Sequence, residues 1–217
     1  MDGRGLKFTL VFVPVLYVVH GLELLSSGSS WAWLGILPRT LRGLTGVIFA
    51  PFLHASWQHL IVNTGPLLVL LALLFMNTRY RPWRSLVWLW ILSGLGTWLI
   101  GRGGTMHIGA SGLICALAAF LVVAGWRLRH WSALLIAGIV VTLYGGLFLA
   151  ALPWTVGPSV SWESHLSGLI VGALVAARLR PPQPDRVEAA ARAALAEADR
   201  LEKLAVQLSD GHPRTRP

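Results

Sequence analysis

The sequence predicts an all-α membrane protein, a polytopic bundle of six transmembrane helices. Of its 217 residues, 55% are hydrophobic and only 12% are charged, whereas an ordinary soluble domain carries about 25% charged residues. Long stretches have no charge at all, and they match the roughly 17–25 residues that a helix needs to cross a bilayer. With the histidines counted as neutral, the uncharged stretches are 43–78, 85–101, 103–126, 130–162 and 164–177.

Six membrane spans follow from this pattern. In chain order they are expected at about 8–25, 55–76, 85–101, 109–126, 131–152 and 162–178. The first could instead be a signal peptide, because Arg4 and Lys7 precede its apolar run. Its run is longer than an ordinary signal core, however, and no clear Ala-x-Ala cleavage site follows it. A transmembrane helix is therefore the favoured interpretation.

The basic residues predict the orientation of these spans. They gather before the first span, between the second and third, between the fourth and fifth, and after the sixth. By the positive-inside rule, both termini are cytoplasmic, in the cell (inner) membrane. The net charge of +9 is then a topology signal, and no nucleic-acid partner is expected. The residues on the inner side are Arg4, Lys7, Arg79, Arg81, Arg84, Arg127, Arg129, Arg178 and Arg180, against Arg39, Arg42 and Arg102 outside.

The chain is expected to form two domains, a six-helix membrane domain over 1–180 and a cytoplasmic tail over 181–217. Prolines at 181, 182 and 184 break the last membrane helix. Asp185 and Glu188 then resemble a capping box that opens a new helix, which is expected to end near Asp210–Gly211. This helix is expected to pack on the protein or to self-associate through its apolar stripe, Leu201, Leu204 and Leu208.

Two potential catalytic residues stand at the starts of different spans. Ser111 lies in Gly109-Ala110-Ser111-Gly112 at the start of the fourth span, and His165 lies in Ser164-His165-Leu166 at the start of the sixth. In the predicted orientation, the second, fourth and sixth spans all run from outside to inside. A nucleophile and a base are therefore expected at the same depth, in the outer half of the bilayer.

Small residues indicate that the fourth and sixth spans touch. Ser111, Cys115 and Ala119 are spaced i, i+4, i+8, and the sixth span has Ser164, Gly168 and Gly172 at the same spacing. Such small-xxx-small surfaces allow membrane helices to approach backbone to backbone. We therefore expect Ser111 to come within hydrogen-bonding reach of His165.

The second span adds hydrogen-bond donors. His59 and Asn63 are separated by four residues and share a helix face. Their side chains, together with the backbone N–H of Ser111 at the positive end of its helix, could stabilise an oxyanion. The alternative is that His59 and Asn63 hydrogen-bond to neighbouring helices as structural residues.

The acidic residues exclude several other chemistries. Only Glu23 and Glu163 lie near a span, and Glu163 is expected to point away from His165 at the surface. The sequence therefore predicts a Ser–His dyad without a carboxylate. The same set of acidic residues excludes a paired-aspartate membrane protease. The single Cys115 excludes a Cys-rich metal site, the absence of His-Glu-x-x-His argues against a zinc protease, and no cofactor is expected. Haem ligation has no evident pair of facing histidines, and ion or proton coupling lacks a membrane-embedded charge.

Taken together, these residues resemble the rhomboid family of intramembrane serine proteases, in its six-span bacterial form. The resemblance covers roughly residues 8–178. It rests on three motifs in this order: His54-x4-His59-x3-Asn63, Gly109-Ala110-Ser111-Gly112 and His165-x2-Gly168-x3-Gly172.

The resemblance implies specific roles and a substrate class. Ser111 would be the nucleophile and His165 the general base of a serine endopeptidase. Its substrates would be transmembrane segments of other membrane proteins in the lipid bilayer, cut near the outer face. One departure is Cys115, which stands where many relatives have a tyrosine. A non-catalytic relative that binds transmembrane clients and a transporter are the alternative functions. The implied oxyanion and supporting residues are His59, Asn63, His54 and Gly109.

Overall fold

A computed structural model describes residues 3–26, 30–157, 160–180 and 184–210. The chain divides into two compact units, Met1–Arg180 and Pro181–Pro217. Within the described residues both units are helical, and the only extended pairing is an isolated antiparallel bridge between Ile36 and His107. The prediction of an all-α fold is therefore confirmed.

Each predicted span contains a helix. Three of the helices, α1, α3 and α5, are long and apolar enough to cross a membrane by themselves. The main departure is at the fifth span, expected over 131–152, where α6 ends at Tyr144 and a single turn, α7 (Gly146–Leu149), follows. The helices are α1 (Gly3–Leu25), α3 (Trp57–Met76), α4 (Pro82–Ile100), α5 (Ser111–Leu128), α6 (Trp131–Tyr144) and α8 (Trp162–Ala177).

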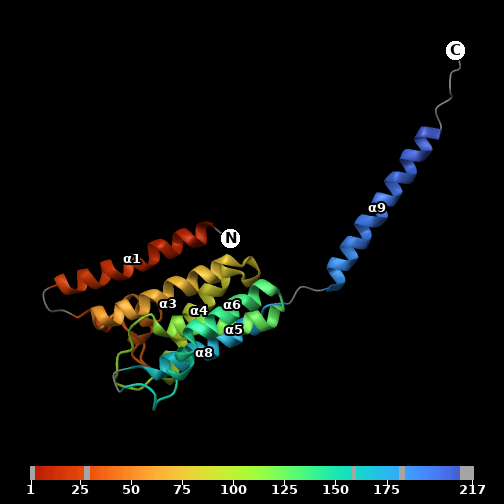
Figure 1. Cartoon of the computed structure of the whole chain (residues 1–217). Helices are drawn as coiled ribbons and strands as arrows, with labels where there is room; N and C mark the ends of the chain where they lie inside the picture. The colour runs from red at the N-terminus through yellow and green to blue at the C-terminus, as the bar shows by residue number, and fades with distance from the viewer. Residues whose placement is uncertain (1–2, 27–29, 158–159, 181–183, 211–217) are drawn as a thin grey trace. The chain divides into compact units, whose positions relative to one another are not determined.

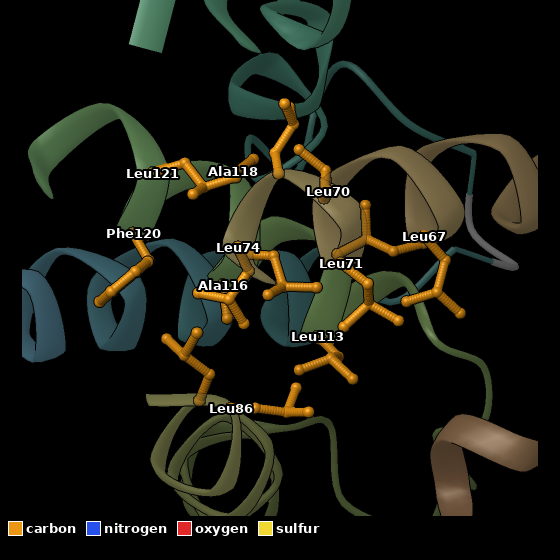
Figure 2. Packing of buried hydrophobic residues seen from close by; sticks show 14 of the residues in the cluster. Leu67, Leu70, Leu71, Leu74, Leu86, Leu113, Ala116, Ala118, Phe120 and Leu121 are labelled. Atoms are coloured by element: carbon orange, nitrogen blue, oxygen red, sulfur yellow. The ribbon is translucent and has the colours of Figure 1, made fainter. Parts of the chain in front are cut away.

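Helix α5 forms the centre of the first unit. About 72% of its 18-residue apolar stretch is buried inside the protein, against 28% of the corresponding stretch of α1. It is surrounded by α3, α4, α6 and α8, whereas α1 lies at the edge beside α3 (Figure 1). The side chains that meet in this core include Leu67, Leu70, Leu71 and Leu74 of α3, Leu86 of α4, and Leu113, Ala116, Ala118, Phe120 and Leu121 of α5 (Figure 2).

Glycines make the contact between α5 and α8 very close. A Cβ atom on Gly168 would collide with the carbonyl oxygen of Gly112 and lie 3.0 Å from the Cβ of Cys115. A Cβ on Gly172 would collide with the carbonyl oxygen of Ala116. Because the paired positions ascend together along both helices, α5 and α8 run parallel. We call this contact the α5–α8 seam, and it confirms the approach that the small residues predict.

The connection between α1 and α3 is folded onto the protein. The Trp90 side chain of α4 donates a hydrogen bond to the Val47 carbonyl oxygen (3.1 Å), and Arg39 donates to the carbonyl oxygens of Leu99 and Gly101 (both 2.9 Å). The connection is thereby fixed against the end of α4. Its short helices are η1 (Trp31–Leu34), η2 (Arg42–Leu44), α2 (Gly46–Phe49) and η3 (Ala50–Phe52), and η4 (Thr78–Tyr80) lies between α3 and α4.

The described part of the second unit is one long amphipathic helix, α9 (Pro184–Asp210). It carries two i, i+4 ion pairs, Arg192–Glu188 (3.4 Å) and Lys203–Asp199 (2.8 Å). Leu195, Leu201 and Leu204 are exposed. The side chain of Leu208, the third member of the predicted stripe, and Gly211 lie outside the described residues.

Candidate active site

Ser111 is the first residue of α5, immediately after a tight turn of the chain. Gly109 adopts a positive φ of 109°, a conformation that favours glycine, and its N–H donates to the Ala50 carbonyl oxygen (2.9 Å). The turn exposes Ser111 to a cavity of about 30 Å³, enough for an ordered water. The cavity lining includes His107, Gly109, Gly112, Ser164, Ser93 and Thr97.

His165 lies in the first turn of α8 and is buried. Its Nδ1 atom is 2.9 Å from the carbonyl oxygen of Ala150. Because a carbonyl oxygen can only accept, Nδ1 must carry the proton of this hydrogen bond. In the neutral ring, Nε2 is then left as an acceptor, which is the form that a general base requires.

The α5–α8 seam brings the chain neighbours of Ser111 and His165 together. A Cβ atom on Gly112 would lie 3.2 Å from the carbonyl oxygen and 3.5 Å from the Cβ of Ser164. The residue that follows Ser111 therefore touches the residue that precedes His165. No hydrogen bond joins Ser111 and His165 across the described residues, and catalytic hydrogen bonds are often formed fully only once substrate is bound.

His59 and Asn63 reach the same turn from α3. A Cβ on Gly109 would lie 2.6 Å from Cε1 and 2.8 Å from Nε2 of His59, and 3.8 Å from Nδ2 of Asn63. Ser56 caps α3 by accepting a hydrogen bond from the His59 N–H (3.1 Å). The Nδ2 atom of Asn63 is buried and has no hydrogen-bond partner within the described residues. It is therefore an available donor directed at the segment that leads to Ser111.

His54 lies just before α3, beside His59. It is 2% exposed, and its ring is edge-on to that of His59, with the centroids 5.0 Å apart. Burial, followed by the nearby His59, lowers the pKa of His54 to about 4. His54 is therefore a neutral neighbour of His59 at physiological pH.

Glu163 corrects one expectation from the sequence. It is buried (1% exposed), not directed to the surface, because Arg102 supplies a counter-charge, with Nε 2.7 Å from Oε1 of Glu163. Arg102 also donates to the Val160 carbonyl oxygen (3.0 Å). The carboxylate is thus paired with Arg102 and makes no hydrogen bond to His165 among the described residues.

A second connection links the loop before α5 to the start of α8. His107 places Nδ1 2.5 Å from Oγ of Ser161. Ser161 in turn caps α8, accepting from the Ser164 N–H (3.3 Å), with its hydroxyl 2.8 Å from that of Ser164. Burial lowers the pKa of His107, and the nearby Glu163 opposes the shift. We call Arg102, His107, Ser161, Glu163 and Ser164 the loop–helix clamp.

The sequence interpretation missed this clamp. Its only visible signal is that Arg102 and Glu163 are isolated charges between long uncharged stretches, and a charge that becomes buried needs a partner. Within the described residues, no group of three or more His, Cys, Asp or Glu side chains is arranged to hold a metal ion.

The fold is a bundle of apolar helices in which α5 and α8 pack closely. This protein is therefore a helical, membrane-embedded protein. Residues 41–182 match the family model described as Rhomboid domain. The chain belongs to the rhomboid family, a family of intramembrane serine proteases.

The chain is also similar to several other proteins, one of which is named as rhomboid-like. An uncharacterized protein of Mycobacterium tuberculosis is 46% identical over 182 residues, covering 80% of this chain and 75% of that protein. An uncharacterized protein of Mycobacterium leprae is 40% identical, with 80% and 71% covered. The chloroplastic Rhomboid-like protein 11 of Arabidopsis thaliana is 28% identical over 147 residues, covering 59% of this chain and 50% of that protein.

Proposed function

We propose that this protein is an intramembrane serine endopeptidase in which Ser111 is the nucleophile and His165 the general base. One observation supports the proposal: His165 donates from Nδ1 to the Ala150 carbonyl oxygen, which leaves Nε2 as an acceptor. In the α5–α8 seam, Gly112, next to Ser111, packs against Ser164, next to His165. A backbone carbonyl then orients the imidazole, a task that an aspartate performs in catalytic triads.

The chemistry proceeds in two steps. His165 Nε2 takes the hydroxyl proton as Ser111 Oγ attacks the peptide carbonyl carbon. Collapse of the tetrahedral intermediate breaks the C–N bond, and His165 passes the proton to the leaving amine. A water then attacks the acyl-enzyme, again with His165 as base, which releases the carboxylic acid and restores the Ser111 hydroxyl.

Donors for the oxyanion converge near Ser111. The backbone N–H of Ser111 is the first of α5 and has no acceptor inside the helix. Asn63 Nδ2 is buried without a partner among the described residues, and His59 lies against Gly109. We assign these groups to stabilise the developing negative charge, with Gly109 providing the space and His54 supporting His59.

The substrates that we propose are transmembrane segments of membrane proteins. The charge pattern favours cytoplasmic termini in the cell (inner) membrane, which puts Ser111 and His165 toward the outer face. An intact substrate helix shields its carbonyl groups by internal hydrogen bonds, so residues that weaken the helix should favour cleavage. We also propose that α9 lets two copies associate through its exposed leucines.

The test is labelling of the detergent-solubilised full chain with a fluorophosphonate, alongside cleavage of a transmembrane model substrate. Wild type should give a Ser111 adduct. Ser111→Ala should give none, and His165→Ala should lose both labelling and cleavage, by several powers of ten.

Ser167→Ala is the matched control. Ser167 lies on α8 with His165, but its hydroxyl donates to the Ser93 carbonyl oxygen (2.9 Å). It should keep the adduct. Folded wild type that binds the substrate segment without labelling or cleaving would favour a non-catalytic client-binding protein instead.

A further inference from the structure

A second cavity lies at the opposite end of α8 from His165. It measures about 170 Å³ and opens between the start of α4 and the end of α8. This volume is several times the roughly 30 Å³ that one water molecule takes in the liquid. The lining residues are Arg81, Arg84, Ser85, Trp88, Val175, Arg178 and Leu179.

Among the described residues of the first unit, no carboxylate compensates the positive charge of this cavity. Arg81, Arg84 and Arg178 are all exposed, and none of their side chains has an ion pair or hydrogen bond to another described residue. The described carboxylates of this unit are Glu23 and Glu163, and Glu163 is held by Arg102 at the other end of α8. The cavity therefore offers three guanidinium groups to an external anion.

The backbone adds to the positive potential. Arg81 is the N-cap of α4 with a left-handed conformation (φ 49°), and Pro82 follows it in the first turn. The N-terminus of a 19-residue helix carries a partial positive charge. Three guanidinium groups and a helix terminus facing one cavity match a phosphate group, which guanidinium binds in a bidentate manner.

The remaining wall includes the apolar side chains of Trp88, Val175 and Leu179. Trp88 is 47% exposed, and Leu179 is 7% exposed. Tryptophan favours the headgroup level of a bilayer. A site with a cationic rim and an apolar wall suits a ligand that is charged at one end and apolar at the other.

We propose that this cavity binds the headgroup phosphate of an anionic phospholipid. Basic pockets between transmembrane helices on the cytoplasmic side are typical sites for such headgroups, and the charge pattern assigns this end of α4 and α8 to the cytoplasmic side. The proposal is independent of the proteolytic activity, because neither Ser111 nor His165 contributes to the cavity.

The test measures lipid affinity of the delipidated full chain in a neutral detergent. Phosphatidylglycerol, phosphatidylcholine and inorganic phosphate are the three probes. Wild type should bind phosphatidylglycerol at least about tenfold more tightly than phosphatidylcholine. Arg84→Gln/Arg178→Gln should lose about tenfold or more of the phosphatidylglycerol affinity and none of the weaker phosphatidylcholine binding.

The matched control is Arg79→Gln/Arg127→Gln, which removes the same charge from exposed positions outside the cavity lining. It should bind phosphatidylglycerol as wild type does. An equal loss in both double variants would overturn the site in favour of diffuse surface attraction. Equal affinity for the two lipids would also overturn it, and competition by phosphate alone at similar concentration would reassign the cavity to a free anion.

A second measurement does not depend on the variants folding. Photoactivatable phosphatidylglycerol is cross-linked to wild type, and the adducts are mapped by mass spectrometry. Adducts should fall within 81–88 and 175–179. Adducts spread evenly over the basic connections, including 127–129, would contradict the proposal.

Discussion

The two ends of α8 use charge in opposite ways. At the end that bears His165, the buried Glu163 is paired with Arg102 and the N-cap Ser161 is bonded to His107. At the other end, Arg178 joins Arg81 and Arg84 around an open cavity. Paired charge fixes the position of a helix, whereas unpaired charge is available to a ligand. The comparison indicates that the first end is built for precise geometry and the second for binding.

The α5–α8 seam lies between the two ends of α8. At Gly168 and Gly172, the backbone of α8 lies directly against α5. A parallel pair of helices held this closely cannot shift in register without collisions. In the proposed mechanism, the seam would therefore hold Ser111 and His165 in alignment, and the loop–helix clamp would hold the first turn of α8.

The largest effect is expected from breaking the seam itself. Gly172→Leu would drive a side chain into the Ala116 carbonyl oxygen, which should cost about 3 kcal/mol of folding stability and abolish labelling of Ser111. Gly138→Leu is the matched control, because a Cβ at Gly138 meets no atom within 4 Å. Thermal unfolding in detergent and fluorophosphonate labelling would measure both. A stable, fully labelled Gly172→Leu would show that the seam does not align the dyad.

The next effect is expected from unpairing the buried carboxylate. Arg102→Gln leaves Glu163, at 1% exposure, without its counter-charge. It should therefore be the more harmful single change, and Glu163→Gln the milder one. Loss of a hydrogen bond to a charged group costs about 1–3 kcal/mol, and the partial exposure of Arg102 (side chain 41% exposed) places the value at the low end.

A double-mutant cycle measures the interaction energy between Arg102 and Glu163. Arg102→Gln/Glu163→Gln should recover part of the loss, because no charge is then buried unpaired. The readouts are the unfolding temperature and the turnover of a transmembrane substrate. Strictly additive losses of stability and turnover would mean that the two residues do not interact energetically. The clamp residues would then be close in space without being coupled.

Much of the fold could be predicted from residue patterns. The uncharged stretches place the helices within a few residues, and the spacing of Ser164, Gly168 and Gly172 predicts the contact with α5 that the structure contains. Helix ends were less predictable. The fifth span was expected to continue to 152, but α6 ends at Tyr144, directly before Gly145 and Gly146. Glycine just after a helix is a stop signal, whereas the prediction follows the apolar composition, which continues to Leu152.

In the candidate site, too, some residues could be predicted from the sequence and others could not. Ser111, His165, His59 and Asn63 could be found because each is a reactive or polar residue inside an apolar stretch. The partners of His165 and Glu163 could not. A backbone carbonyl such as that of Ala150 has no sequence signature, and Arg102 lies 61 positions from Glu163. Contacts of this kind depend on how loops close, which local patterns do not encode.

A smaller effect is expected from His107, and it should depend on pH. Burial lowers the pKa of His107, Arg102 and Arg39 lower it further, and the Arg102 carbonyl oxygen and Glu163 oppose this. The unfolded chain then takes up the proton first as the pH falls below about 6.5, so acid should destabilise the folded state through this group. His107→Asn should retain a hydrogen bond to Ser161 and lose less stability between about pH 7.5 and pH 5.5.

The readout is the difference in unfolding temperature between the two pH values. His107→Ala provides the comparison, since it removes both the proton site and the contact with Ser161. It should be less stable than His107→Asn at every pH. If wild type and His107→Asn lose the same stability in acid, the titration that matters lies elsewhere in the protein.

The smallest effect on chemistry is expected from removing the tail. α9 belongs to a unit separate from the membrane helices, and its described side chains contribute no residue to the lining of either cavity. A chain ending at Arg180 should therefore keep its turnover within about twofold, because units with their own contacts act independently. Its assembly should change, since the exposed Leu195, Leu201 and Leu204 are removed with the proposed self-association surface.

Analytical ultracentrifugation in detergent separates these two consequences. The full chain should sediment as a larger species than the truncated chain after correction for mass, and Leu201→Glu/Leu204→Glu should behave like the truncation. A tenfold loss of turnover in the truncated chain, with the unfolding temperature unchanged, would mean that the tail acts on the site at the far end of α8. The contrast between the proposed catalytic end of α8 and its proposed binding end would then have to include the tail as a regulator.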